Sequence, residues 1–519
     1  MTIPRTMTAT KTTKMLSELL SDQTVRNDVA ITGIAYDSRK VARGDLFFAL
    51  PGEKTDGAQF AAQAAASGAA AIVSASTIDV ALPLIVVDNP RRIMAEISHR
   101  FYGHPDRTID LVGVVGTNGK STVAAGLQIV WETAGVKSGL FGTLNYRWGD
   151  YSEPASRTTP EAPDLDRLLA RMRDDGVKRA VMEVSSHALT LDRVWGLRYK
   201  GGIFTNITRD HLDFHKTFEN YRDAKRLFFE RLSAPGCFAA VNIEDANQAH
   251  FVTACPKARV IMYSGSGEDV EVKLAIVSHD LDGTHGRLVI NGESWPFHST
   301  LWGRFNHANL AATAAGAYGS GVDGATIARG LGEFHGIMGR AERVHSSAPF
   351  HVFVDYAHTP DALDAVLGAA RVLVRGRLIA LFGCGGDRDR GKRPEMAQAA
   401  ARWADELILT SDNPRGEDPN AIIEDAKKGF ASDDLARKVW TDPDRARAIT
   451  HAITIARHGD AVFLCGKGHE DYQETKGVKS HFLDHEVAMR ALEAAGYPSL
   501  VASVVEPRKG PTPPGGDGS

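Results

Sequence analysis

A glycine-containing loop near residue 116 has the composition of a phosphate-binding site. The segment VGTNGKST, residues 115–122, offers glycines for close backbone approach, a lysine for charge and hydroxyls for magnesium. An apolar strand precedes it and a helical pattern follows, so the N-terminus of that helix adds positive potential toward a phosphate. It is shorter than the general GxxxxGKS loop, because Val114 stands five residues before Gly119. The predicted nucleotide contacts are Gly116, Thr117, Asn118, Gly119, Lys120, Ser121 and Thr122.

This loop alone does not define a reaction. A mechanical or signalling ATPase would carry it, and so would a regulatory module that only binds a nucleotide. Other residues have to distinguish these classes from an enzyme that transfers the phosphoryl group.

Two polar residues that could hold a metal ion follow apolar strands further along the chain. They are Glu183 in MEVSSHAL and His211 in TNITRDHLDFH. Either one alone would be an ordinary solvated loop residue. In an α/β fold, however, strand ends meet at one edge of the sheet, beside the phosphate loop. Phosphoryl transfer needs divalent cations to neutralise developing charge, so we predict a Mg²⁺ site there.

The alternation of strands and helices predicts an α/β protein with several domains. A chain of 519 residues exceeds the roughly 250–300 residues at which one core stops growing. We predict a small α/β domain at 1–107, a central domain with a mainly parallel sheet at 108–341, and a third domain at 342–500. The third domain has four strands that end in polar loops, which is typical of a doubly wound, Rossmann-like sheet. The proline- and glycine-rich tail at 501–519 is predicted to be disordered.

The composition excludes several classes of partner. A formal net charge of -4 gives no general attraction for polyanions, so we expect no nucleic-acid partner. The four cysteines are scattered, without the spacing of a zinc site or a disulfide framework, and are expected to be free thiols. No apolar run reaches the roughly 20 residues that span a bilayer, and the first residues lack the apolar region of a signal peptide. We therefore expect a cytoplasmic protein without membrane insertion.

Five motifs together resemble the Mur ligase family. They are GTNGKST, MEVSSH, FTNITRDHLDFH with YRDAKRLFF, GRFNHANLAATAA and VDYAHTPDAL, in family order from about residue 30 to 495. The resemblance implies an ATP-dependent amide-bond ligase of peptidoglycan precursor synthesis. Its three domains would bind a UDP-linked substrate, ATP and an amino acid, in that order along the chain. It also implies two Mg²⁺ ions, ATP as a substrate and a monomeric enzyme.

The resemblance assigns roles around the phosphate loop. Ser121 and Glu183 would hold a first Mg²⁺, and Glu183, His211 and a carbamylated Lys225 would serve a second, with Lys120 acting on the transferred phosphoryl group. A carbamate on Lys225 would replace a repelling ammonium by an oxygen ligand suited to a hard cation. Without the resemblance, Lys225 would be an exposed lysine on the helix YRDAKRLFFERL.

Further ATP contacts are implied in the second half of the chain. Asn306 and His307 match the family's adenine-side residues, Arg340 its interdomain arginine, and Asp355 its ribose or metal-water contact. From its position alone, Asn306 would be a helix cap.

The implied contacts to a UDP-linked muramoyl dipeptide lie in the first half. They are Tyr36, Ser38, Glu53, Lys54, Thr55, Thr158, Thr159, Ser185, Leu191 and Arg193. Leu191 departs from the polar residue that is frequent at its position in this branch of the family. Alone, the sequence around Ser38 is only a turn.

The incoming amino acid implied by the resemblance is meso-diaminopimelate. Its contacts would be Asp412, Asn413, Pro414, Arg415, Arg388, Gly466 and Glu470. A fixed guanidinium at Arg415 can grip the second carboxylate, which lysine lacks. The alternative for this segment is a proline turn with an exposed arginine. The rivals for the whole chain are a lysine-adding sister, a folylpolyglutamate-type ligase and a non-catalytic nucleotide-binding scaffold.

Overall fold

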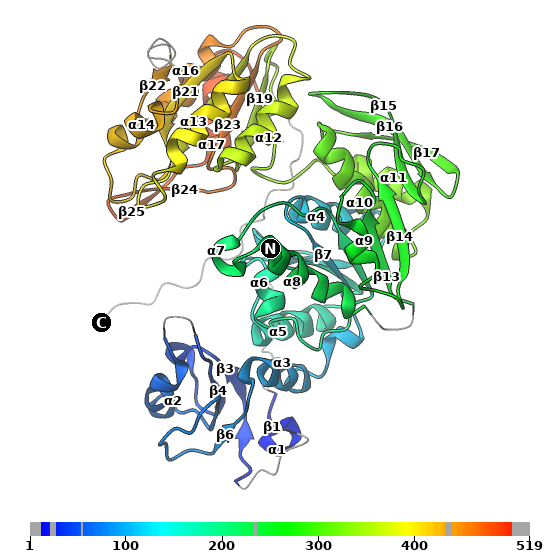
Figure 1. The fold of residues 1–519 in the computed structure, drawn as a ribbon, viewed down its shortest axis with the longest axis vertical. Helices are drawn as coiled ribbons and strands as arrows, with labels where there is room; N and C mark the ends of the chain where they lie inside the picture. Colours follow the sequence, from blue (N-terminus) through cyan, green and yellow to red (C-terminus); the bar gives the residue numbers. More distant parts are fainter. Residues whose placement is uncertain (1–11, 21–26, 53–54, 233–235, 431–438, 501–519) are drawn as a thin grey trace, which may run out of the picture. The chain divides into compact units, whose positions relative to one another are not determined.

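The computed structural model describes residues 12–20, 27–52, 55–232, 236–430 and 439–500 (Figure 1). These residues form two compact units. The first unit contains the described residues up to 263 and 312–323, and the second contains 264–311 and those from 324 onward. The predicted contacts Glu53 and Lys54 and the predicted tail lie outside the described residues. The predicted domain boundaries stay predictions.

The first unit begins with a parallel sheet buried on both faces. In spatial order its strands are β3 (Gly33–Ala35), β4 (Asp45–Ala49), β5 (Ala71–Ser74) and β6 (Leu84–Val86). Successive residues of a strand point to opposite faces. Leu46 therefore shares a core with α3 (Pro90–Phe101), and Phe47 shares one with α2 (Ala61–Ala66). Burial on both faces explains the uninterrupted apolar run in β4.

A larger, mainly parallel sheet forms the rest of the first unit. Its spatial order is β10 (Tyr151–Pro154), β9 (Asn145–Trp148), β8 (Ser138–Phe141), β11 (Arg179–Glu183), β7 (Asp110–Val115), β12 (Gly201–Phe204), β13 (Phe238–Asn242) and β14 (Arg259–Ser264). Only β9 and β10 are antiparallel to their neighbours in this series. The accompanying helices are α4 (Lys120–Thr133), α5 (Ala162–Asp174), α6 (Ser186–Thr190), α7 (Leu212–His215), α8 (Phe218–Glu230) and α9 (Gln248–Val252).

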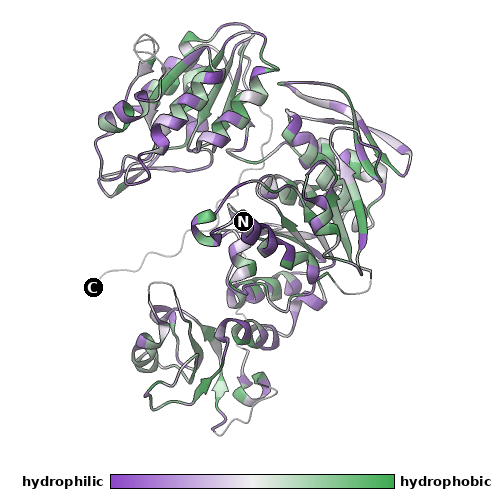
Figure 2. Ribbon diagram, viewed as in Figure 1, coloured by the Kyte–Doolittle hydropathy of each residue, from purple (hydrophilic) through white to green (hydrophobic). Residues whose placement is uncertain are grey.

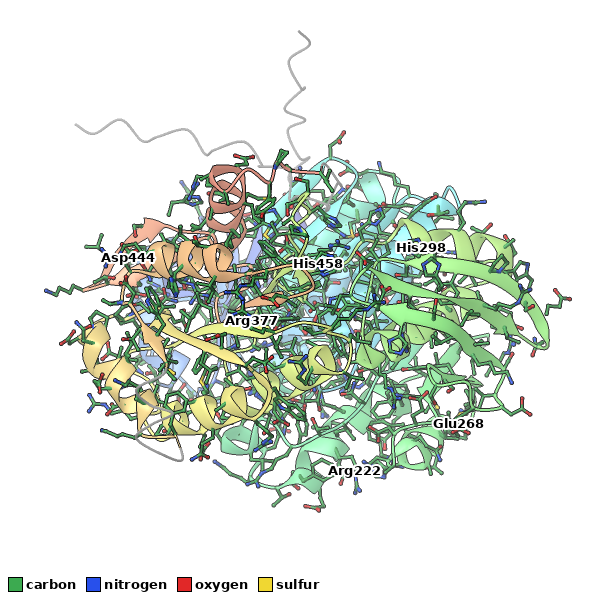
Figure 3. All side chains as sticks on the ribbon, turned by 90° about the horizontal axis from the view of Figure 1, so that it is seen from above. Arg222, Glu268, His298, Arg377, Asp444 and His458 are labelled. Atoms are coloured by element: carbon green, nitrogen blue, oxygen red, sulfur yellow. The ribbon has the colours of Figure 1, made fainter. Side chains whose placement is uncertain are left out.

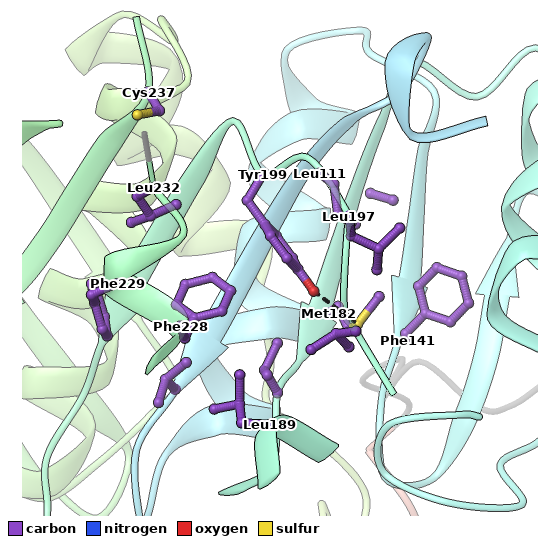
Figure 4. Packing of buried hydrophobic residues seen from close by; sticks show 14 of the residues in the cluster. Leu111, Phe141, Met182, Leu189, Leu197, Tyr199, Phe228, Phe229, Leu232 and Cys237 are labelled. Carbon is purple, nitrogen blue, oxygen red and sulfur yellow. Dashed lines mark hydrogen bonds between the residues drawn. The ribbon is translucent and has the colours of Figure 1, made fainter. Parts of the chain in front are cut away.

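Helix α8 packs closely on this sheet through phenylalanine side chains (Figure 4). Phe228 lies directly over β7, where a Cβ atom on Gly113 would come within 2.3 Å of its ring. Tyr199 lies beside Phe228 in the same core, and its hydroxyl donates to the sulfur of Met182 at 3.9 Å. Glycine at 113 thus lets α8 approach the strand that leads into the phosphate loop.

The second unit contains an antiparallel meander and a second parallel sheet. The meander is β15 (Val272–Asp280), β16 (Gly283–Ile290) and β17 (Glu293–Ser299). The first half of α10 (Arg304–Gly319), up to residue 311, and α11 (Gly324–Glu333) also belong to this unit. The sheet has the order β18 (Glu342–Arg343), β19 (His351–Asp355), β23 (Ala461–Cys465), β20 (Leu378–Cys384), β21 (Glu406–Ser411) and β22 (Trp440–Thr441). All of these except β18 run parallel.

Helices cover both faces of this second sheet. One core joins it to α12 (Pro360–Arg371), α13 (Lys392–Trp403) and α14 (Pro419–Lys427). The other joins it to α16 (Arg445–Ile455) and α17 (Asp484–Ala494). The strands are mainly hydrophobic, whereas the helices carry many hydrophilic residues (Figure 2). The predicted α/β class with a doubly wound C-terminal sheet is confirmed.

Acidic side chains lie at the surface, and the cysteines are in the state that their spacing predicts. Glu268 and Asp444 are exposed (Figure 3). All four cysteines are buried, and none forms a disulfide, as predicted. Within the described ranges, no helix has the length and apolar character needed to cross a membrane.

A buried ion pair joins α3 to α5. His99 Nδ1 lies 2.8 Å from Asp166 Oδ2, and His99 Nε2 lies 2.8 Å from the carbonyl oxygen of Trp195. Burial of His99 opposes its charged form, but the hydrogen bond and charge of Asp166 prevail and raise its pKa to about 9.

This pair predicts a fall in stability at alkaline pH. Because the pKa of His99 is raised in the folded state, its contribution is complete below about pH 6.5 and is lost as the pH rises through about 9, by roughly 3 kcal/mol. The melting temperature should fall between pH 6.5 and 9.5, and less in a His99→Gln variant. His250→Gln, which breaks a more exposed pair with Asp223, is the matched control. Equal pH dependence in wild type and His99→Gln would contradict the prediction.

Candidate active site

The phosphate loop connects β7 to α4. Gly119 has φ +84°, in the left-handed region that favours glycine, and a Cβ on Gly116 would lie 1.8 Å from Thr205 Oγ1. Lys120 Nζ donates to the carbonyl oxygens of Gly116 and Thr117 at 3.0 and 2.9 Å. Both glycines are therefore required by the local backbone, and the lysine is folded over the loop.

Glu183 lies at the end of β11, opposite Val114 of β7, and its side chain is buried. Its carboxylate accepts from Ser121 Oγ at 2.9 Å, from Thr143 N at 2.8 Å and from Thr143 Oγ1 at 3.1 Å. In the described part of the chain it makes no ion pair. A buried carboxylate with only neutral donors beside the phosphate loop suits a hard divalent cation, and carboxylate plus hydroxyl oxygens are appropriate ligands for Mg²⁺.

Lys225 of α8 is buried, at 2% exposure, so its interpretation as an exposed lysine is wrong. Its Nζ donates to the carbonyl oxygen of Gly116 at 2.8 Å. Burial, with a smaller effect from the charge of Lys120, holds the pKa of Lys225 well below its usual value. The site therefore favours the neutral amine.

His211 lies at the start of α7 with φ +52°, and its side chain is about half exposed. Its ring centroid is 6.0 Å from that of Tyr221, and Lys225 Nζ is 4.6 Å from the same Tyr221 ring. The Tyr221 hydroxyl is 3.1 Å from Thr117 Oγ1 in the phosphate loop. The structure thus places His211 and Lys225 around one tyrosine beside the phosphate loop.

The described residues contain no preformed cluster of three or more histidine, cysteine or acidic side chains that could hold a metal. This is compatible with Mg²⁺, which usually binds one or two carboxylates and completes its coordination with water and substrate phosphates.

Several predicted contacts to the UDP-linked substrate adjoin Glu183. Thr159 is fully buried, its Oγ1 donates to the carbonyl oxygen of Glu183 at 2.8 Å, and the same atom accepts from Ser185 N at 3.1 Å. Arg193 is held by Glu161, with Nε 2.9 Å from Oε1. Thr159 and Arg193 are therefore oriented by the protein itself.

The other predicted contacts of this group are more dispersed. Thr158 Oγ1 lies 3.2 Å from Thr143 Oγ1, and Leu191 directly follows α6. In the N-terminal sheet region, Tyr36 donates to the Asp164 carboxylate, and Ser38 Oγ donates to Gln63 Oε1 at 2.9 Å. Thr55 is exposed.

The predicted adenine-side and ribose contacts lie in the second unit. Asn306 Nδ2 donates to the carbonyl oxygen of Trp302 at 2.9 Å, near the start of α10, and His307 Nε2 lies 3.1 Å from Thr284 Oγ1. Arg340 lies over the Tyr356 ring at 5.0 Å. Asp355, at the end of β19, accepts from Ala341 N at 2.6 Å and Ala357 N at 2.8 Å.

The predicted amino-acid contacts gather where β21 and β23 end. Asn413 is buried, and its Nδ2 donates to Glu470 Oε2 at 2.8 Å while its Oδ1 accepts from Glu474 N at 2.9 Å. Its side-chain amide is therefore used within the protein. Asp412 directly precedes it, and Gly466 has φ +113°.

Arg415 is anchored rather than freely exposed, which argues against the simple turn interpretation. Its guanidinium Nη1 donates to the carbonyl oxygen of Gly386 at 2.9 Å, and its side chain is 22% exposed. Its backbone has φ +51° and is held by β24 (Tyr472–Thr475), since Arg415 N donates to the carbonyl oxygen of Glu474 at 3.0 Å. Both Arg415 and the exposed Arg388 border Gly385, and the carbonyl of Pro414 packs against Gly386.

Comparison with known proteins identifies the family. Three family models match: "Mur ligase family, catalytic domain" at residues 30–102, "Mur ligase middle domain" at 114–317 and "Mur ligase, glutamate ligase domain" at 339–468. A Bacillus velezensis protein named UDP-N-acetylmuramoyl-L-alanyl-D-glutamate–2,6-diaminopimelate ligase is 42% identical over 93% of this chain and 99% of its own length. The chain belongs to the Mur ligase family.

Other Mur ligases agree in sequence and fold. A Synechococcus elongatus relative of the same name is 42% identical over 92% of this chain and 97% of its own. A solved structure with that name superposes with a TM-score of 0.71 at 32% identity and covers 93% of this chain and 99% of its own. A structure of the UDP-N-acetylmuramoylalanyl-D-glutamyl-2,6-diaminopimelate–D-alanyl-D-alanyl ligase from Acinetobacter baumannii, 18% identical with a TM-score of 0.60, covers 94% of this chain and 99% of its own and shares the fold.

The motifs missed residues that support these sites from elsewhere in the chain. Thr143 binds Glu183 through both its backbone and its hydroxyl, Glu161 orients Arg193, and Lys467 lies among the amino-acid contacts. Lys467 is part of the GKGHED segment and could have been considered. Thr143 and Glu161 belong to none of the sequence motifs.

Loss of the Thr143 hydroxyl should weaken the metal site. Partners that orient a metal ligand typically contribute about 10–100-fold to metal affinity or activity, so Thr143→Val should raise the Mg²⁺ concentration for half-maximal activity by about that factor. Thr253→Val removes an exposed hydroxyl that bonds only to helix carbonyls and is the control. The interpretation fails if both variants show the Mg²⁺ dependence of the wild type.

Proposed function

We propose that this Mur ligase joins meso-diaminopimelate to the D-glutamate of UDP-N-acetylmuramoyl-L-alanyl-D-glutamate, with conversion of ATP to ADP and phosphate. The anchored guanidinium of Arg415, which donates to the carbonyl oxygen of Gly386, is the observation that carries the choice of amino acid. The relatives bear the name of this activity. The product is a precursor for peptidoglycan in the bacterial cell wall.

The chemistry requires activation, because a carboxylate is a poor electrophile. A D-glutamyl carboxylate oxygen attacks the γ-phosphorus of ATP, ADP leaves, and an acyl phosphate forms. The amine of diaminopimelate then attacks the acyl carbon, loses a proton and displaces phosphate to give the amide. No covalent enzyme intermediate is needed, so the protein contributes orientation and charge stabilisation.

The protein's own groups serve the first step. Lys120 exchanges its loop carbonyl partners for phosphate oxygens, and the loop amides and the N-terminus of α4 add positive potential. Ser121 and Glu183 would hold one Mg²⁺, and Glu183, His211 and Lys225 would serve a second. When bound, the ions would neutralise charge on the transferred phosphoryl group. Thr159, Ser185 and Arg193 orient the UDP-linked substrate.

Lys225 acts as its carbamate. Its neutral amine attacks carbon dioxide, a nitrogen–carbon bond forms and one proton is released. The product is a carboxylate-like group in a buried position beside the phosphate loop, and this replaces a cation by an anionic oxygen ligand.

The enzyme acts on small molecules in the cytoplasm as a monomer, without a nucleic-acid partner. A lysine-adding enzyme would have no use for the anchored Arg415. A non-catalytic scaffold would not need Lys120, Glu183, His211 and Lys225 together.

The reaction is tested by phosphate release from MgATP and the UDP-linked dipeptide, with meso-diaminopimelate, L-lysine or no amino acid. Release should require meso-diaminopimelate, because only this amino acid offers a second carboxylate to Arg415. Release with lysine instead would overturn the specificity, and release without any amino acid would indicate a plain ATPase.

Lys225→Ala should lose most of its activity and recover part of it with short-chain carboxylates, which can occupy the position of the carbamate. Lys216→Ala, on an exposed lysine nearby in the chain, is the control and should keep full activity. Full activity of Lys225→Ala without added carboxylate would contradict the carbamate.

A further inference from the structure

Lys467 contacts three of the predicted amino-acid contacts. Its side chain is fully buried, and its ammonium nitrogen lies 3.3 Å from Glu470 Oε2, 3.4 Å from Asn413 Oδ1 and 3.8 Å from Asp412 Oδ1. A buried ammonium is tolerated only when charged or polar partners surround it. Its positive charge therefore lies among three of the predicted amino-acid contacts.

The charges around Lys467 do not cancel. Asp412 and Glu470 carry two negative charges against its single positive charge, and Asn413 is neutral. Asp412 Oδ1 is buried and has no hydrogen-bond partner within the described residues, so it remains an acceptor for a ligand. The cluster thus has one excess negative charge, which suits a single substrate ammonium.

We propose that Lys467 is a specificity-determining residue. Its positive charge makes the site favour an amino acid of zero net charge over a cationic amino acid. The inference rests on the proposed function. Meso-diaminopimelate has two carboxylates and two ammonium groups, whereas L-lysine has one carboxylate and two ammonium groups. Removal of the Lys467 charge makes the site more negative and favours lysine relative to diaminopimelate.

The neighbouring scaffold is independent of Lys467. Arg445 and Asp484 form a fully buried pair, with Nη2 2.6 Å from Oδ2. The same guanidinium donates to the carbonyl oxygens of Ser411 at 3.2 Å and Cys465 at 3.0 Å, at the ends of β21 and β23. The strand ends that carry the two loops are thus held together without Lys467, and its loss acts through charge.

The test compares kcat/KM for meso-diaminopimelate and for L-lysine in wild type, Lys467→Met and Lys427→Met. Lys427 forms an ion pair with Glu424 at 2.9 Å on α14 and is the matched control. The diaminopimelate-to-lysine ratio should fall roughly tenfold or more in Lys467→Met, the size expected for one charge within about 10 Å. It should stay unchanged in Lys427→Met. An unchanged ratio in Lys467→Met would overturn the proposal.

A double variant, Lys467→Met with Glu470→Gln, separates charge from structure. It restores the net charge of the cluster, so its ratio should return to within about threefold of the wild type even though its absolute activity falls. A diaminopimelate-to-lysine ratio that stays tenfold lowered in the double variant would overturn the proposal. This test also holds if Lys467→Met alone does not fold. If wild type turned over neither amino acid, the proposed function itself would be contradicted, and the inference with it.

Discussion

A charge buried at the carboxyl end of a parallel strand must be compensated by what lies beside it, and this constraint shapes both units. In the first, Glu183 is buried with only neutral donors, and Lys225 is buried against a carbonyl oxygen. In the second, Lys467 is buried among acidic and amide groups. Neither a bare carboxylate nor a bare ammonium is stable in such places. The first arrangement fits the proposed Mg²⁺ and the proposed carbamate on Lys225, and the second fits the proposed charged substrate.

The strands and the phosphate loop could be predicted because their signals are local. Apolar runs such as the one in β4 mark strands buried on both faces, and Gly116 and Gly119 mark a loop that only glycine permits. The meander β15–β17 was missed, although part of it alternates between buried and exposed residues as an antiparallel sheet does. The alternation is difficult to recognise in the sequence, because strands and helices alternate on both sides of this segment.

The support of the sites could not be predicted from local patterns. Thr143 meets Glu183 across 40 positions of the chain, and Arg445 meets Asp484 across 39. Lys225 looked like a surface lysine, since its burial depends on how closely α8 approaches β7 at Gly113. Only the family resemblance pointed to it. A residue that only supports a site residue far away in the sequence belongs to no short motif. A residue of the phosphate loop does belong to one, and can therefore be predicted.

Activation of the substrate carboxylate by ATP is tested most directly by oxygen transfer. The UDP-linked dipeptide, labelled with ¹⁸O in its D-glutamyl side-chain carboxylate, is ligated with MgATP and meso-diaminopimelate, and the released phosphate is examined by mass spectrometry. Passage through an acyl phosphate predicts one ¹⁸O atom in the phosphate for each amide bond formed. Unlabelled phosphate released together with the amide product would contradict the account.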